Sequence, residues 1–370
     1  MRVLGVQMRD FRTYARAEAS LGPGLTVVHG PNGAGKSNLL EALYWGCTGR
    51  SPRTRNEREL IRFGAEATRV VVRLSDGSEP HELSVGYGFA AGRPVKRMTS
   101  DGAPVERLLD VEHRPLASVF APDRLELIKG APALRRAHLD QLVAAMWPLR
   151  AEDRRAYGRV LAQRNALLGR IRAGRASPAT LGAWDRELAE AAITVRGHRA
   201  AACELLAAPF SERAARLGCS GEVSLEYRPA ARAGDVDEFT AELGQRLAGD
   251  LERGYTGYGP HRDELALVRD GRELRSYGSQ GEQRLALLAL LLAERAVLAA
   301  ERDRTPLMLL DDVMSELDRE RRELLAQELG TGGQSVIATT DLTHVPGAAD
   351  AHVTRLRVST GTILSEAIAA

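Results

Sequence analysis

The sequence predicts an α/β fold that combines a parallel sheet carrying a phosphate-binding loop, an antiparallel β subdomain and an inserted helical lobe. Three stretches of the chain lead to this prediction. Residues 25–44 run from a β-branched apolar segment through a glycine-rich turn into helix-forming residues. Residues 68–98 alternate apolar and polar side chains around Asp76-Gly77, as a meander with a hairpin turn does. Residues 131–217 change to long helical runs, with breaks at Trp147-Pro148 and near residues 174–178.

The most specific motif is the segment from Gly30 to Ser37, which matches G-x-x-x-x-G-K-[ST] completely. Glycines allow backbone N–H groups to turn toward phosphate oxygens, and the start of the following helix adds a positive dipole end. Only three of the 51 basic residues are Lys, and one of them stands here. The alternative is a glycine-rich turn that binds nothing. The expected nucleotide-binding residues are Gly30, Pro31, Asn32, Gly33, Ala34, Gly35, Lys36 and Ser37.

Composition places the chain among ordinary globular proteins. It has 370 residues, of which 44% are hydrophobic and 27% are charged, with a net charge of only +2. No apolar run is long enough to span a membrane and the first residues do not form a signal peptide, so we expect a cytoplasmic protein. Three cysteines without metal-ligand spacing are expected to be free thiols.

Two Arg-rich stretches are candidates for contact with DNA backbone. Residues 48–62 hold five Arg against two Glu, and residues 150–175 hold eight Arg against two acids. The alternative for the first stretch is a solvated connector, and for the second it is a solvated helical hairpin. The sequence leaves both choices open. The candidate DNA-contacting residues are Arg53, Arg55, Arg58, Arg154, Arg155 and Arg159. Phe11 and Tyr14 pose a similar choice between adenine stacking and a core or hairpin role.

Acidic residues follow a short apolar run late in the chain. Residues 306–310 predict a buried parallel strand, and Asp311 and Asp312 come directly after it. Ligands of open α/β sheets bind at the carboxyl ends of strands. We therefore expect Ser37 and Asp311 to hold Mg²⁺, while Lys36, Asp311 and Asp312 form the catalytic set, with Asp312 orienting a water for attack on the γ-phosphate.

A second helix start precedes this strand. Ser279 is followed three residues later by Glu282, which predicts a capping box at the start of an unbroken helix reaching about Ala300. Such a helix start also binds phosphate readily, although it lies far along the chain from the P-loop. Residues 236–253 are expected to form one helix and residues 335–340 a strand. Residues 255–263 form a glycine-rich loop that carries His261, Arg262 and Asp263.

Taken in order, these motifs resemble the RecF family of SMC-like ABC-type ATPases, which act in DNA repair. Besides the P-loop, the segment Ser279 to Glu282 and Asp311-Asp312, the resemblance rests on residues 49–53, 120–123, 255–263 and 278–284. It runs nearly end to end and is weakest in the helical lobe. It implies an ABC-type P-loop NTPase head divided into an N-terminal part at 1–130, a helical arm lobe at 131–220 and a C-terminal part at 221–370.

The resemblance also implies a mechanism. ATP and Mg²⁺ would lie between two heads of a homodimer, with the signature Ser279, Gln280, Gly281 and Glu282 acting in trans and the D-loop residues Ser315 and Asp318 at the seam. Family members bind duplex DNA and single-strand/duplex junctions as ATP-induced dimers, hydrolyse ATP slowly, and act with RecO and RecR to load RecA at gaps. Two departures from the wider ABC pattern are Asp312 where Glu is usual, and Thr339, Thr340 and Asp341 where a switch histidine is expected.

Two other classes of protein share parts of this pattern. A transporter-type ABC subunit would carry a compact helical subdomain where this chain has a long helical arm. A small-molecule P-loop kinase would not need the Ser279 to Glu282 signature or the segment from Ser315 to Asp318. Both are therefore disfavoured against an ATP-gated DNA clamp.

Overall fold

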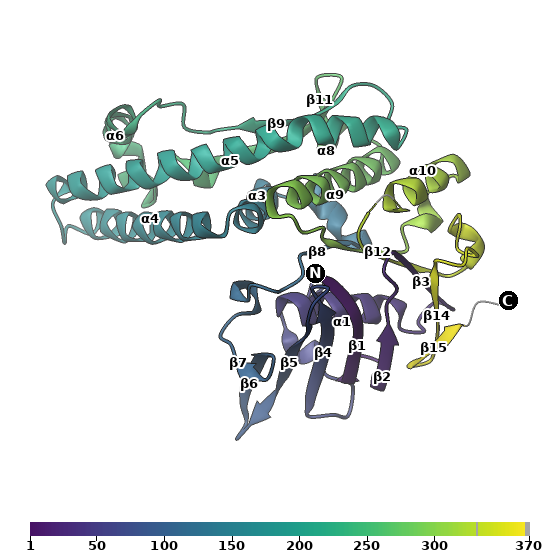
Figure 1. Cartoon of the computed structure of the whole chain (residues 1–370). Coiled ribbons are helices and arrows are strands. Elements are labelled where there is room, and N and C mark those ends of the chain that lie inside the picture. The colour runs from purple at the N-terminus through teal and green to yellow at the C-terminus, as the bar shows by residue number, and fades with distance from the viewer. Residues whose placement is uncertain (331, 367–370) are drawn as a thin grey trace. The chain divides into compact units, whose positions relative to one another are not determined.

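The structure is a computed structural model that describes residues 1–330 and 332–366 (Figure 1). The chain forms two compact units. Unit 1 comprises Met1–Arg124, Arg216–Gly218 and Leu298–Ala370, and unit 2 comprises Leu125–Ala215 and Cys219–Val297. The three-part division after residues 130 and 220 describes the chain differently and stays a prediction.

Unit 1 contains the predicted parallel sheet. Its strands lie in the order β15-β14-β3-β13-β12-β8, and all except β15 run parallel to their neighbours. Their bounds are β3 Leu25–His29, β8 Ala117–Phe120, β12 Leu307–Asp311, β13 Ser335–Thr339, β14 Thr354–Ser359 and β15 Thr362–Glu366. The three strands β3, β13 and β12 are almost entirely buried, which explains their short continuous apolar runs. The strands predicted at 25–29, 306–310 and 335–340 are confirmed.

An antiparallel sheet is the second layer of unit 1, with β1, β4 and β5 side by side (Figure 1). Its strands are β1 Arg2–Phe11, β2 Tyr14–Ser20, β4 Ala67–Ser75, β5 Pro80–Ala90, β6 Arg93–Ser100 and β7 Ala103–Pro104. They confirm the predicted meander. Phe11 pairs with Tyr14 across the β1–β2 hairpin, and both side chains are 0% exposed. The core role therefore holds for both aromatic residues, and neither presents a ring for stacking on a base.

The P-loop helix α1 (Lys36–Thr48) packs against strands of both sheets of unit 1. Its side chains are buried on nearly every face, including Trp45 at 0% exposed, as expected of a helix enclosed by two layers. Gly46 permits the close approach to the antiparallel sheet, because a Cβ there would lie 2.3 Å from Val72 Cγ2. Helix α10 (Arg319–Gly330) follows β12 in the same unit.

Unit 2 is mainly helical. Its helices are α2 Glu126–Lys129, α3 Pro132–Met146, α4 Ala151–Arg172, α5 Gly182–Arg216, α6 Val236–Gln245, α7 Leu247–Arg253 and α8 Leu274–Tyr277. Helix α9 spans Gln280–Arg302, of which residues 298–302 belong to unit 1. A small antiparallel sheet contains β9 Val223–Arg228, β10 Glu264–Arg269 and β11 Arg272–Glu273. Helices α4 and α5 run side by side (Figure 1), and Tyr157, Leu188 and Phe239 join them to α6 in one apolar cluster.

The helix breaks predicted in unit 2 are confirmed. Two other predictions for this unit are corrected, one about a helix and one about an arginine. The single helix expected over 236–253 is two helices that meet at Arg246, just after Gly244, whose low helix propensity weakens the last turn of α6. Arg164, one of the eight Arg counted as a basic surface, is fully buried. Its guanidinium contacts Asp185 at 2.6 Å and Asp250 at 2.9 Å, so it fastens α4 to α5 and α7.

Membrane insertion has no candidate segment in the described residues. No helix within 1–330 or 332–366 is both long enough and apolar enough to cross a bilayer.

Candidate nucleotide-binding site

The turn between β3 and α1 has the backbone shape that the P-loop motif predicts. Gly30, Gly33 and Gly35 have φ values of 151°, 78° and 116°, a region that side chains disfavour. A Cβ on Gly30 would lie 2.1 Å from the Val358 carbonyl oxygen, and one on Gly35 would lie 2.8 Å from the Tyr14 hydroxyl. Only glycine fits at these two positions.

Lys36 begins α1 and turns back along the loop. Its Nζ donates hydrogen bonds to the carbonyl oxygens of Gly30 at 2.8 Å and Pro31 at 3.0 Å. The residue is only 8% exposed, and this burial lowers the pKa of its ammonium group, while the charges of Asp312 and Asp311 oppose the shift. The ammonium group therefore lies along the loop and is coupled electrostatically to the two acids.

Ser37 and Asp311 meet directly, although 274 positions separate them in the chain. Ser37 Oγ donates to Asp311 Oδ1 at 2.9 Å. Burial raises the pKa of Asp311, whereas the Ser37 hydrogen bond and the Arg53 charge lower it. In an octahedral Mg²⁺ shell with bonds of about 2.1 Å, neighbouring oxygens are about 3 Å apart. One hydroxyl and one carboxylate oxygen at this spacing fit two adjacent positions of that shell.

Asp312 leaves the strand in a different direction from Asp311. Its φ is 51°, a left-handed conformation that Asp tolerates better than most residues. Its Oδ1 is buried and makes no hydrogen bond within the described part of the chain. Such an orphaned carboxylate oxygen is costly unless a water or ligand occupies it, so Asp312 is suited to hold a water beside the phosphates.

Strand β13 lies between β3 and β12 in the strand order. A switch histidine is expected just after its carboxyl end, and Thr339, Thr340 and Asp341 stand there instead. The Asp341 N–H donates to Thr339 Oγ1 at 3.3 Å, and the Thr343 N–H donates to Asp341 Oδ1 at 2.9 Å. This second bond holds the pKa of Asp341 below its usual range. The sequence motifs gave no sign of His344, whose Nδ1 is buried and makes no hydrogen bond within the described residues.

A network of side chains braces the P-loop, and the sequence motifs do not reveal it. Tyr14 Oη donates to the Gly35 carbonyl at 2.9 Å. The Glu41 side chain on α1 is 0% exposed and accepts hydrogen bonds from Arg12 at 2.8 and 2.9 Å. Ser51 Oγ also donates to Glu41, at 2.6 Å. An acid in a buried helix shortly after the P-loop was the signal that could have identified this network.

The six candidate DNA-contacting arginines fall into two groups. In the first, Arg53 contacts Asn38 at 3.0 Å and Glu41 at 3.3 Å, while the guanidinium of Arg58 lies 5.4 Å from the Phe89 ring centroid and Arg55 is exposed.

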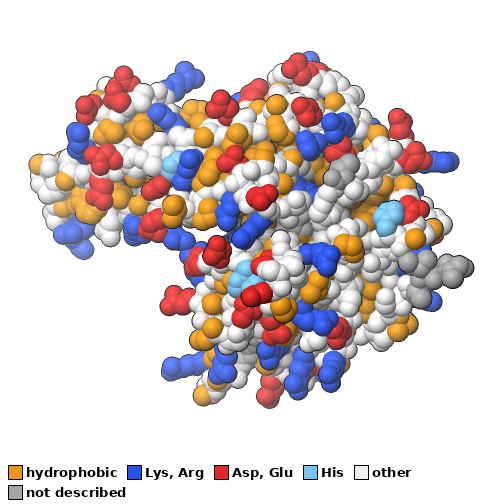
Figure 2. Space-filling model, viewed as in Figure 1, with side chains coloured by type: hydrophobic (Ala, Val, Ile, Leu, Met, Phe, Trp, Pro, Cys, Tyr) orange, Lys and Arg blue, Asp and Glu red, His pale blue; other side chains and the backbone are white. Residues whose placement is uncertain are grey.

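The second group lies on α4 and is paired with acids. Arg154 pairs with Asp140 at 2.7 Å, and both Arg155 and Arg159 pair with Glu152. On the face drawn in Figure 2, basic and acidic side chains are interspersed, so that view shows no separate basic stripe.

The signature segment lies in unit 2. The predicted capping box is present: the Ser279 N–H donates to Glu282 Oε2 at 2.8 Å, and the Glu282 N–H donates to Ser279 Oγ at 3.3 Å. Glu282 also forms an ion pair with Arg269 of β10. Ser279, Gln280 and Gly281 are exposed. The first turn of α9 is therefore capped by two hydrogen bonds and open to solvent.

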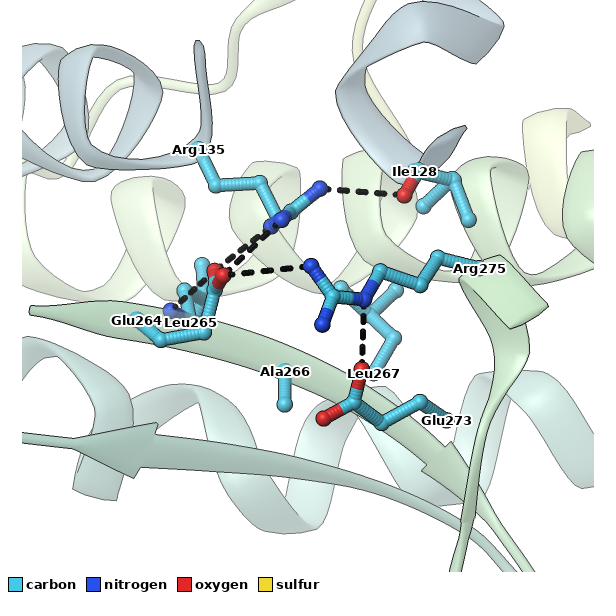
Figure 3. Close-up of a pocket in the computed structure, with 8 residues that line it drawn as sticks. All are labelled: Ile128, Arg135, Glu264, Leu265, Ala266, Leu267, Glu273 and Arg275. Atoms are coloured by element: carbon cyan, nitrogen blue, oxygen red, sulfur yellow. Dashed lines mark hydrogen bonds and ion pairs between the residues drawn. The ribbon is translucent and has the colours of Figure 1, made fainter. Parts of the chain in front are cut away.

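An ion-pair cluster supports the strand that leads toward this signature (Figure 3). Arg135 of α3 donates to Glu264 at 2.7 and 3.0 Å and to the Ile128 carbonyl at 3.0 Å, while Arg275 contacts Glu264 at 3.7 Å and Glu273 at 2.5 Å. The remaining space of about 10 Å³ is roughly that of one water molecule. The cluster therefore holds β10, α3 and α8 together and is too full for a ligand.

The D-loop residues lie between β12 and α10 in unit 1. Ser315 Oγ donates to the Asp312 carbonyl at 2.9 Å. Asp318 Oδ1 accepts the Arg321 N–H at 2.9 Å, which is the bond of an N-cap at the start of α10. Its other oxygen, Oδ2, lies 3.2 Å from the Arg321 guanidinium, and 57% of the Asp318 side chain stays exposed to solvent.

Comparison with known proteins gives relatives over nearly the whole chain. A family model described as an AAA domain matches residues 6–97. The curated "DNA replication and repair protein RecF" of Heliobacterium modesticaldum is 34% identical over 352 residues, covering 93% of each chain. The protein of the same name from Streptomyces avermitilis is 38% identical over 380 residues, covering 98% of this chain and 99% of its own.

Solved structures agree. A structure described as the "recombination mediator protein RecF-ATPrS in RecFOR pathway" superposes with a TM-score of 0.85 at 28% identity, covering 99% of this chain and 98% of its own. An Smc head domain from Pyrococcus furiosus matches with a TM-score of 0.61 at 16% identity, over 99% and 96% of the two chains, which is similarity of fold alone. The predicted ABC-type head fold is therefore confirmed.

Proposed function

The chain belongs to the RecF family of DNA replication and repair proteins, and from this premise we propose that it is an ATP-gated DNA-binding protein of recombinational repair and replication restart. The contact between Ser37 and Asp311 is the observation that carries the proposal. It brings a P-loop hydroxyl and the carboxylate of a neighbouring strand end to the spacing of two Mg²⁺ ligands. A solved relative at 28% identity is described as RecF-ATPrS, which supports a ligand of the ATP type here.

Within this site we assign each residue a separate task. The N–H groups of the loop from Gly30 to Gly35 would surround the phosphates, and Lys36 would exchange its carbonyl partners for the β- and γ-phosphate oxygens. Mg²⁺ would be held by Ser37 and Asp311 and would neutralise phosphate charge. Asp312 would orient the attacking water. Its side chain is one methylene shorter than the Glu usual in ABC ATPases, which favours slow hydrolysis.

The second half of the mechanism requires another copy of the chain. We assign Ser279, Gln280, Gly281 and Glu282 to the γ-phosphate of ATP held by a partner head, because the first turn of α9 is capped and exposed. Ser315 and Asp318 would lie at the seam between heads. ATP would then link two copies, and the resulting dimer would hold DNA.

The variant Ser279→Arg tests this arrangement. Arginine at the helix start would block approach of a second head while leaving the P-loop intact. We expect normal ATP binding by equilibrium dialysis, but no ATP-dependent rise in mass by light scattering. The matched control is Ser276→Arg, which places the same side chain at an exposed position of α8. An ATP-dependent dimer of Ser279→Arg equal to wild type would rule the arrangement out.

For DNA and protein partners we propose duplex DNA and single-strand/duplex junctions, with RecO and RecR acting beside this protein to load RecA in the cytoplasm. The solved relative with a TM-score of 0.85 is described as a mediator in the RecFOR pathway, which supports these partners. Sedimentation of the purified chain on gapped DNA, with and without ATP, provides the test. A complex that forms equally well without nucleotide would contradict ATP gating.

The two groups of candidate arginines can be separated by salt dependence. The slope of log K against log salt is negative, and each phosphate contact that is removed makes it shallower by about 0.9. We expect the double variant Arg55→Gln/Arg58→Gln to reduce the slope. Arg155→Gln/Arg159→Gln is the comparison and should change it less, because Glu152 already pairs with both residues. Equal slopes for wild type and both variants would remove these four residues from the DNA interface.

A further inference from the structure

We propose that His81, Asp101 and His113 form a binding site for a divalent transition-metal ion, with Zn²⁺ as the best match. These residues lie in unit 1 and include none of those assigned to the nucleotide. His81 is on β5, Asp101 follows β6 at the turn before β7, and His113 follows the short 3₁₀ helix Leu108–Asp110. The site is independent of the proposed ATP-gated function.

The rings of His81 and His113 both approach one carboxylate oxygen of Asp101. His81 Nδ1 lies 2.9 Å and His113 Nε2 lies 3.4 Å from Asp101 Oδ2. One potential ligand atom from each residue lies within 4.8 Å of the other two. In a tetrahedral Zn²⁺ site with bonds of about 2.0–2.1 Å, ligand atoms are about 3.4 Å apart. Small side-chain rotations would therefore bring all three into one coordination shell, with water as the fourth ligand.

Neighbouring groups already orient these ligands. Asp101 Oδ1 accepts the Glu82 N–H at 2.7 Å, which directs Oδ2 toward the two imidazoles. Asp76 Oδ2 lies 3.8 Å from His81 Nε2, on the side of that ring away from Asp101. A carboxylate behind a coordinating histidine is the usual outer-shell partner of a metal-bound imidazole. Ser100 Oγ lies 2.8 Å from His113 Nε2, and metal binding would exchange this hydrogen bond for coordination.

The local charge favours a cation. The two imidazole rings stack with centroids 4.1 Å apart and an interplanar angle of 13°, so the His81 ring lies against His113, which lines an open hollow. The open hollow beside them is lined by Asp101, Glu106, Asp110 and Glu112, against one base, Arg107, which itself pairs with Asp110 at 3.6 Å. The net negative lining would attract a divalent ion and disfavour anions.

Occupation of the site would tie three separate segments together. The ion would join β5, the β6–β7 turn and residues 105–113, a loop that otherwise contains only a three-residue 3₁₀ helix. A ligand that binds the folded state stabilises it. We therefore expect Zn²⁺ to raise the thermal unfolding midpoint of the full chain.

The test uses the purified full-length chain after chelator treatment and dialysis. Co²⁺ serves as the spectroscopic probe, and Zn²⁺ is measured by isothermal titration calorimetry and by metal content. We expect one Zn²⁺ per chain, together with the strong visible absorption of tetrahedral Co²⁺. His81→Ala/His113→Ala should lose both signals. His352→Ala is the matched control, because His352 is exposed in the same unit, and it should keep them.

Further variants separate this site from the nucleotide site and from folding defects. Asp311→Asn should leave the Co²⁺ spectrum unchanged. Asp101→Asn retains the size and the amide-accepting oxygen of Asp101, and it should weaken Zn²⁺ binding at least tenfold without unfolding the chain. X-ray absorption of the Co²⁺-loaded wild type should count two imidazole ligands. Zn²⁺ binding equal in wild type and in the His81/His113 double variant, no measurable binding in wild type, or a spectrum without imidazole ligands would each overturn the proposal.

Discussion

At the scale of single residues, the candidate nucleotide site contains charged groups that are buried, and burying a charge costs free energy. Lys36 is 8% exposed, and burial shifts its pKa and that of Asp311 toward their neutral forms. Each is compensated by partners within the site: loop carbonyls for the ammonium group and the Ser37 hydroxyl for the carboxylate. Phosphates and Mg²⁺ would replace these partners with stronger ones, so the site gains most when the ligand is bound.

The first residue-scale prediction concerns Lys36→Met, which removes the ammonium group but keeps an apolar chain of similar length. A charge-assisted contact contributes about 1.5–3 kcal/mol, so ATP affinity should fall about 10- to 100-fold. Lys129→Met is the control, because Lys129 is exposed on α2 of the other unit. Binding of a fluorescent ATP analogue measures both. Wild-type affinity in Lys36→Met would refute the phosphate role of this residue.

A second prediction separates binding from hydrolysis at Asp312. Asp312→Asn keeps the shape of the side chain but cannot accept a proton from water. We expect ATP binding within a factor of a few of wild type and phosphate release slower by about 100-fold or more. Asp311→Asn should instead weaken Mg²⁺-dependent binding, since Asp311 is the residue that contacts Ser37. If Asp312→Asn hydrolyses ATP at the wild-type rate, another group orients the water.

At the scale of elements, the P-loop helix α1 is held in place by buried polar contacts as well as by packing. Glu41 is fully buried and accepts hydrogen bonds from Arg12, Arg53 and Ser51, which come from the β1–β2 hairpin and from the segment after α1. The polar connector at 48–62 is therefore tied to the helix, at least through Ser51 and Arg53. Of the arginines in this segment, Arg53 is placed by these contacts before any ligand binds.

Glu41→Gln tests this network. Neutralising a fully buried acid leaves Arg12, which is only 20% exposed, without its charge partner. Removing one member of a buried pair costs about 3 kcal/mol or more, so unit 1 should unfold at clearly lower urea. Fluorescence of buried Trp45 provides the readout, in a background where Trp147 and Trp184 of unit 2 are replaced by Phe. The exposed substitution Glu66→Gln should have little effect, and equal midpoints for the two variants would show that Glu41 carries no stabilising role.

At the scale of the whole molecule, the P-loop and the signature belong to different compact units of one chain. The proposed dimer would combine the P-loop of one copy with the signature of the other. A mixture of two inactive variants can therefore distinguish this arrangement from one in which each chain completes its own site.

We predict that Lys36→Met and Ser279→Ala, each nearly inactive alone, regain ATP hydrolysis when mixed. Alanine removes the Ser279 hydroxyl without adding bulk, so two heads can still meet. A heterodimer of the two has one site with both defects and one site with neither, because the intact P-loop of Ser279→Ala meets the intact signature of Lys36→Met. Phosphate release should rise with the concentration of the second variant. Mixing Lys36→Met with Lys36→Met/Ser279→Ala is the control and should stay inactive. Absence of rescue in the first mixture would contradict the trans arrangement.

Much of the fold was predictable because it depends on local patterns. The P-loop, the meander, the helix breaks and the capping box at Ser279 each depend on neighbours a few residues apart. The break at Arg246 was missed because a single glycine near a helix end is a weak local signal. The burial of Arg164 was missed because composition counts charges without knowing which face of a helix is covered.

The sequence by itself determined which residues can bind a polyphosphate, because the glycines, the lysine and the helix start that phosphate requires are consecutive in the chain. Only the tertiary structure decided that Ser37 touches Asp311, that Glu41 braces α1, and that His81, Asp101 and His113 converge. The physical reason is that such contacts depend on strand order and packing between layers, which no local pattern encodes. Side chains hundreds of positions apart become partners only when a sheet places their strand ends together.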